Sequence, residues 1–180
     1  LNGLYAFGGI YAVGVLGWST IQLGVFGILA SVTGIIGCVL GGWLDNRMGT
    51  KNVVTFAIIS LLIASGLVIS TSATEAFFMP VEPGSNLPTI IFYCAGALIG
   101  AAGGALQAAS RPLLVDQADP EKIGEAFGLY ALSGKATAFL APLGIFIFTE
   151  LSGSQRIGIT PIFVLFLVGL ILLIPVRSKR

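Results

Sequence analysis

Apolar residues fill this chain in six long blocks, separated by short stretches of glycine, proline and charged residues. A helix of about 20 mainly apolar residues spans a lipid bilayer, and most of the blocks have about that length. They cover residues 1–17, 21–44, 53–72, 89–109, 125–151 and 157–176. This pattern predicts an all-α membrane protein of six transmembrane helices.

The first block is the shortest, and the chain begins inside it at Leu1 rather than at a methionine. No charged segment typical of a signal peptide precedes the block. We therefore expect a fragment whose first helix has lost its beginning.

The composition is typical of a protein embedded in a lipid bilayer, and it excludes several kinds of functional site. Of the 180 residues, 56% are hydrophobic and only 9% are charged, against roughly 25% charged in soluble domains. A net charge of +1 offers no basic surface for nucleic acid, and the absence of histidine removes histidine metal ligands and Ser-His nucleophiles. We expect no cofactor or metal and no enzymatic activity. Cys38 and Cys94 lie in apolar blocks, so we expect buried free thiols.

Basic residues mark one side of the membrane, since cytoplasmic loops retain Lys and Arg. With six crossings, one side holds Arg47, Lys51, Arg111, Lys122, Arg177, Lys179 and Arg180, whereas the other holds only Arg156. The loop 73–88 carries Glu75 and Glu82 and no basic residue. We expect both termini in the cytoplasm, and the protein in a bacterial inner (plasma) membrane.

Glycines at four-residue spacing predict which helix faces pack together. Gly37 and Gly41 share a face of the second block, and Gly96, Gly100 and Gly104 share one of the fourth. Such stripes let a neighbouring backbone approach closely.

Three polar clusters are candidates for function. The first follows the second block and contains Asp45, Asn46, Arg47, Gly49 and Lys51. Gly49 allows a tight reversal, and Arg47 and Lys51 can bond the carbonyls at a helix C-terminus. The cluster is either a latch that opens with helix movement or an ordinary positive-inside turn.

The second cluster ends the fourth block, where three- and four-residue steps place Gly100, Gly103, Gly104, Gln107, Ser110 and Arg111 on one helix face. In hydrocarbon Gln107 must bond a neighbouring helix or line a wet cavity, and the sequence leaves both open. Pro112 should then stop or kink the helix.

The third cluster lies in the fifth block. Lys135 falls well inside the span, where an ammonium costs roughly 2.5–3.5 kcal/mol, so it is functional or else snorkels or supports structure. Tyr130, Ser133 and Thr137 share a different face from Lys135. Pro142 can bend the helix, and the sequence does not decide which face lines a cavity.

These clusters resemble the major facilitator superfamily. Gly42, Asn46, Arg47, Gly49 and Lys51 fit its loop motif G-x-x-x-D-R-x-G-x-[RK], with Asn46 in place of the Asp. Residues 7–12, 103–111, 127–130, 134–135 and 153–158 are similar to the vacuole effluxer-like branch, which includes the autophagy-related vacuolar amino-acid exporter family.

The resemblance implies that residues 1–180 are helices seven to twelve of a twelve-helix transporter, a half-bundle of two inverted three-helix repeats whose N-terminal six-helix half is missing. It implies secondary active transport of a small solute by alternating access, with amino-acid efflux by analogy. Lys135, Gln107, Asn2, Tyr130, Ser133 and Thr137 would then contact solute or couple transport. Asp45, Asn46, Arg47, Gly49, Lys51, Ser110 and Arg111 would gate the cytoplasmic side. The alternative is a non-transporting membrane scaffold or assembly subunit.

Overall fold

The computed structural model describes residues 1–82 and 85–176, apart from the side chain of Asn2. In chain order its elements are α1 (Asn2–Gly14), α2 (Thr20–Met48), α3 (Thr50–Ser70), β1 (Glu75–Ala76), β2 (Met79–Pro80), α4 (Leu87–Gln117), the short 3-10 helix η1 (Pro120–Lys122), α5 (Ile123–Thr137), α6 (Leu140–Ser152), α7 (Gln155–Gly158) and α8 (Thr160–Leu173).

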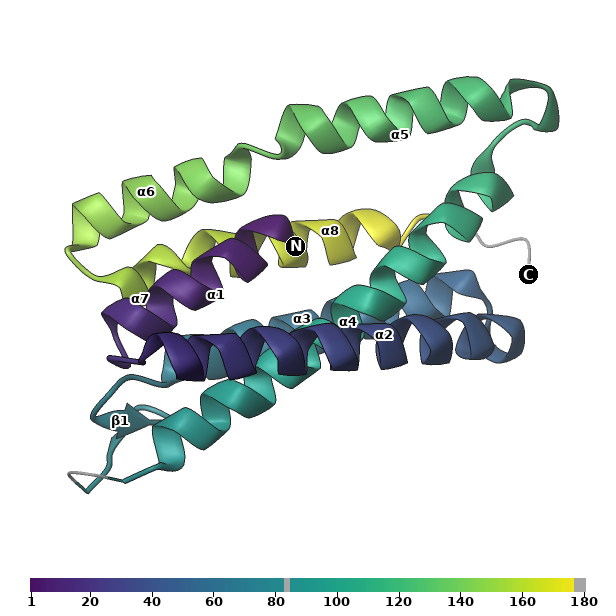
Figure 1. Ribbon diagram of the computed structural model, residues 1–180. Coiled ribbons are helices and arrows are strands. Elements are labelled where there is room, and N and C mark those ends of the chain that lie inside the picture. The colour runs from purple at the N-terminus through teal and green to yellow at the C-terminus, as the bar shows by residue number, and fades with distance from the viewer. Residues whose placement is uncertain (83–84, 177–180) are drawn as a thin grey trace.

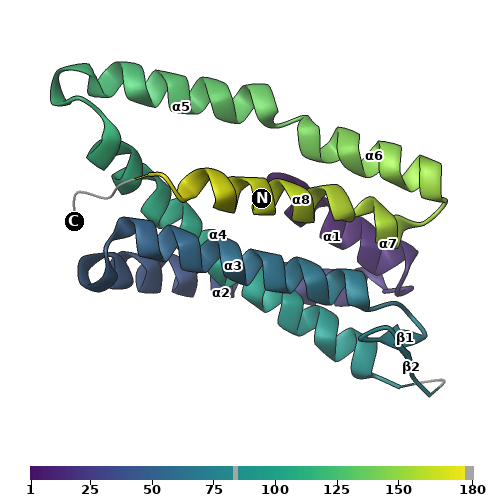
Figure 2. The same cartoon turned by 180° about the vertical axis from the view of Figure 1, so that it is seen from behind.

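The helices run side by side between two ends of a bundle (Figure 1 and Figure 2). We call the end with β1, β2 and the α6–α7 turn the hairpin end, and the end with the α2–α3 turn and the α4–α5 connection the basic end. Among the described residues, five helical stretches are long and apolar enough to cross a membrane, and a shorter apolar helix covers Gly3–Gly14. The predicted all-α membrane bundle is confirmed.

The closest helix contact in the bundle joins α2 to α4. The predicted glycine stripes meet there, with Gly37 against Ala101, Gly41 against Ala105, Gly100 against Ala30 and Gly104 against Gly34. A methyl group at any of these four glycines would overlap backbone atoms of the facing helix. The prediction that the glycine faces pack against a neighbouring backbone is confirmed.

The apolar core forms where α3 packs against α4 and α8. Leu61 and Ala64 of α3 are fully buried, as is Tyr11 of α1, whose ring stacks on Phe92 of α4 at 5.8 Å. By contrast, α2, α5 and α6 expose most of their large apolar side chains. In a membrane these exposed faces meet lipid or other transmembrane helices.

Prolines affect the helices differently from what the sequence suggests. Pro112 does not stop α4, which continues to Gln117, so that part of the prediction is wrong. The fifth block is interrupted at Ala138 and Phe139, between α5 and α6. Pro142 has no N–H for the carbonyl of Ala138, which explains the break at this point.

Two further expectations need correction. The loop 73–88 contains an antiparallel pair, β1 with β2, that the apolar pattern does not indicate. Cys38 and Cys94 are free, as expected, but both are exposed on the bundle surface rather than buried.

The α2–α4 contact makes a direct prediction about stability. Gly37→Val should lower the stability of the bundle by about 1–3 kcal/mol, because the added side chain must push the α4 backbone away. Gly24→Val on the same helix is the matched control, since a Cβ at Gly24 meets no atom within 4 Å. Thermal unfolding in detergent measures both, and equal loss in the two variants would contradict the packing.

Candidate functional site

A groove of roughly 570 Å³ opens between α1, α2 and α4. Its walls are largely apolar side chains and glycines, interrupted by four polar or thiol groups. The lining residues are Tyr5, Gly9, Leu23, Phe26, Gly27, Ala30, Ser31, Gly34, Ile35, Cys38, Gly104 and Gln107. Size and lining are typical of a site for a small solute.

Gln107 lies in this groove three residues beyond Gly104, the last glycine of the α4 stripe. Its side chain is exposed, and the described part of the chain gives its amide no hydrogen-bond partner. This placement favours the cavity-lining interpretation over a bond between helices. An amide held there can accept from and donate to a solute.

Three groove residues were not identified from the sequence. Tyr5 donates its hydroxyl to the carbonyl of Ile99 at 3.4 Å and thereby joins α1 to α4. Ser31 bonds back to its own helix, and Cys38 contacts the carbonyl of Gly104 at 3.3 Å. All three lie in apolar blocks, and only Ser31 and Cys38, which share α2 with Gly37 and Gly41, have a spacing relative to a glycine stripe that could have indicated the groove.

Two predicted clusters meet through a short chain of hydrogen bonds. The hydroxyl of Tyr130 on α5 donates to Ser110 Oγ on α4 at 3.2 Å. Ser110 in turn donates to the carbonyl of Gln107 at 3.2 Å. The middle of α5 is therefore connected to the part of α4 that carries the groove amide.

The other predicted residues of α5 lie apart from the groove. Ser133 and Thr137 bond backbone carbonyls of α5 itself, and Lys135 is exposed. α5 runs along the bundle at a distance from α2 (Figure 1), and its side chains from Ala131 to Thr137 are all exposed. The face of α5 that carries Lys135 and the face that carries Tyr130 are thus both exposed on the surface of the bundle.

The first polar cluster forms a tight turn at the basic end. Gly49 has φ of 81°, a conformation that favours glycine, and it alone separates α2 from α3. Lys51 donates to the carbonyl of Ile174 at the end of α8, at 2.8 Å, which is the expected contact with a helix C-terminus. Arg47 differs from the expectation, because its guanidinium stacks 4.0 Å above the ring of Trp43.

The remaining members of the gating set have modest roles in this geometry. The amide of Asn46 donates to the carbonyl of Gly42 at 3.3 Å, within α2. Asp45 is half-buried, and its Oδ1 has no hydrogen-bond partner. Arg111 is exposed, and the side chain of Asn2 lies outside the described residues. No group of three potential metal ligands occurs among the described residues.

Comparison with known proteins agrees with the architecture. Residues 1–142 match the family model described as Major Facilitator Superfamily. A Bacillus subtilis protein described as an uncharacterized MFS-type transporter, YxiO, is 27% identical to this chain in the aligned part. The alignment covers 47% of this chain and 20% of that relative. No solved structure matches.

Fungal relatives align along nearly the whole chain. Autophagy-related protein 22 from two strains of Cryptococcus neoformans is 24% identical over 94% of this chain, which corresponds to 31% and 29% of those proteins. The chain therefore spans about a third or less of the length of these curated relatives. With a matched family model over residues 1–142 and an all-α half-bundle of apolar helices, this chain belongs to the Major Facilitator Superfamily.

Proposed function

We propose that this chain supplies helices seven to twelve of a secondary active transporter that moves a small solute by alternating access. The observation that carries the proposal is the groove between α1, α2 and α4, with Gln107 exposed in its wall. Such a groove on one half-bundle becomes a solute site when a second half closes it. The much greater length of the relatives supports a second half in the complete protein.

The proposed solute is small and carries a carboxylate, as an amino acid or a related metabolite does. Lys135 would attract the carboxylate, and Gln107 would donate and accept hydrogen bonds at a neutral group. Tyr130, Ser133 and Thr137 would line the same pathway from α5. Asn2, near the start of α1, would add a further amide. Efflux is the proposed direction, by analogy with the vacuole effluxer-like branch.

The basic end is the proposed cytoplasmic gate. There Gly49 fixes the α2–α3 turn, Lys51 holds the end of α8, and Ser110 joins α4 to Tyr130. Movement of α5 relative to α4 would break the Tyr130 bond first, because α5 buries none of its side chains. Asp45, Asn46, Arg47 and Arg111 would complete this gate.

Lys135 provides the test of function in the full-length parent protein. Lys135→Met should still insert into the membrane, because it removes a charge that is costly inside the bilayer. It should reduce flux of solute in vesicles roughly tenfold or more, since a hydrogen bond to a charged group contributes about 1.5–3 kcal/mol. Lys135→Arg should restore little, because the guanidinium is larger and planar.

The matched control for this test is Lys122→Met, which removes an exposed lysine of η1 outside the groove. Flux and the amount of folded protein must be measured on the same preparation. If the Met variant at position 135 transports normally per folded molecule, Lys135 is not part of the mechanism. If the unsubstituted parent moves no amino acid or related solute, the proposed solute class is wrong.

Orientation gives a separate prediction. We propose that the basic end faces the cytoplasm, because Lys51, Arg111 and Lys122 gather there and positive loops stay inside. A membrane-impermeant thiol reagent applied to intact cells should label Ser85→Cys and spare Lys122→Cys. Both positions are exposed. Labelling of both, or of Lys122→Cys alone, would contradict this orientation.

A further inference from the structure

Two cations lie at the N-terminal ends of long apolar helical stretches, Lys51 in Thr50–Ser70 and Arg156 in Gln155–Leu173, where the helix dipole disfavours them. Lys51 is the second residue of α3, and Arg156 lies in α7 directly before α8. The N-terminal end of a helix carries partial positive charge, so Lys51 gains no stability from α3 and Arg156 gains none from α8. Their positions need another explanation.

Lys51 of α3 reaches the C-terminal end of α8, and Arg156 of α7, which precedes α8, reaches the C-terminal end of α3. Lys51 Nζ donates to the carbonyl of Ile174, directly after α8, and Arg156 Nε donates to that of Ile69, in the last turn of α3, at 2.8 and 2.5 Å. α3 and α8 pack together and run in opposite directions (Figure 2). The two contacts therefore lie at opposite ends of the same helix pair.

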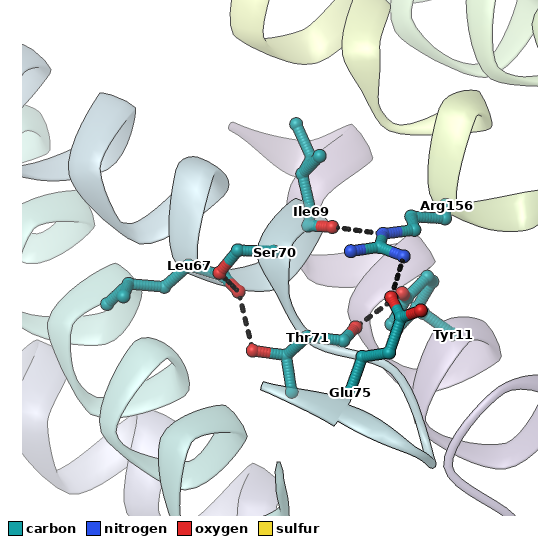
Figure 3. A network of polar contacts seen from close by, with 7 residues as sticks. All are labelled: Tyr11, Leu67, Ile69, Ser70, Thr71, Glu75 and Arg156. Carbon is teal, nitrogen blue, oxygen red and sulfur yellow. Dashed lines mark hydrogen bonds and ion pairs between the residues drawn. The ribbon is translucent and has the colours of Figure 1, made fainter. Parts of the chain in front are cut away.

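The C-terminal end of α3 shows how complete this capping is (Figure 3). The carbonyl of Leu67 accepts from the hydroxyls of Ser70 and Thr71, and that of Thr71 accepts from the hydroxyl of Tyr11 at 2.7 Å. Arg156 supplies the donor for Ile69. Carbonyls without donors are costly where lipid replaces water, so this donor has a structural purpose.

The hairpin fixes Arg156 in place. Its Nη1 forms an ion pair with Glu75 of β1 at 2.6 Å (Figure 3). Its guanidinium also lies 4.7 Å above the ring of Phe78. The side chain of Arg156 is 23% exposed, which protects the pair partly from water. The sequence predicted only that Arg156 lies on the side opposite the basic loops.

We infer that Lys51 and Arg156 are a reciprocal pair of helix caps that fastens α3 to α8 at both ends, so that the two helices form one rigid strut. Each residue positions the other helix through its terminal carbonyl. The Lys51 contact also belongs to the proposed gate, whereas the Arg156 contact and the rigidity of the helix pair go beyond the proposed transport function. Its Arg156 end is the stronger one, because Glu75 and Phe78 hold that cation.

Spin-label distances across the strut test the inference in the full-length parent chain, in lipid nanodiscs without solute. One pair of labels, at Ile63 and Val164, reports the hairpin-end half, and a second pair, at Phe56 and Ile171, reports the basic-end half; all four positions are exposed.

Lys51→Met should broaden the second distribution, and Arg156→Met the first. Lys51→Arg should keep the unsubstituted distributions, because it retains the cation. Lys122→Met, which removes an exposed cation of η1, is the matched control and should change neither distribution.

Two results would overturn the strut. One is that neither methionine variant broadens its own end, and the other is that each broadens both ends equally, as general destabilisation would. If Arg156→Met does not fold, Arg156→Lys retains a cation but cannot bond the carbonyl of Ile69 and Glu75 with two separate N–H groups, and it should broaden the hairpin end alone. Because no solute is present, failure of the strut is distinguishable from failure of the proposed transport.

Discussion

Close approach of the α2 and α4 backbones is the constraint on which the rest of this half-bundle depends. Within lipid, apolar surface gives helices little reason to associate, so packing between small residues has to hold them together. Glycines and alanines at the contact supply that packing. The same contact forms one side of the groove, because Gly104 belongs to the stripe and Gln107 follows it on α4. The contact between α2 and α4 therefore both holds the bundle together and shapes the proposed solute site.

The parts of the fold that depend on local sequence could be predicted. The apolar blocks predicted the membrane-spanning helices, and the glycine spacing predicted which faces of α2 and α4 pack together. Gly49 indicated the turn, since a single residue with positive φ joins two helices there. Lys51 was expected to bond a helix C-terminus, although the sequence could not say that the helix is α8.

Features that depend on distant partners could not be predicted. The ion pair of Arg156 with Glu75 and the bond of Tyr130 to Ser110 join residues from separate elements, and no spacing rule connects them. The extension of α4 beyond Pro112 was missed, because a proline removes one hydrogen bond without necessarily ending a helix. Lys135 lies on a helix exposed on both predicted faces, so contacts within the described residues do not connect it to the groove.

Water access to the groove is the most direct test of this account. Ser31 lines the groove, and the neighbouring Val32 is exposed on α2 outside it, at nearly the same depth. Each would be replaced by cysteine in the membrane-embedded parent protein, with Cys38 and Cys94 changed to alanine. The account predicts that a water-soluble thiol reagent modifies Ser31→Cys, more slowly when solute is present, and spares Val32→Cys. Equal reactivity at the two positions, or reaction at Val32→Cys alone, would contradict it.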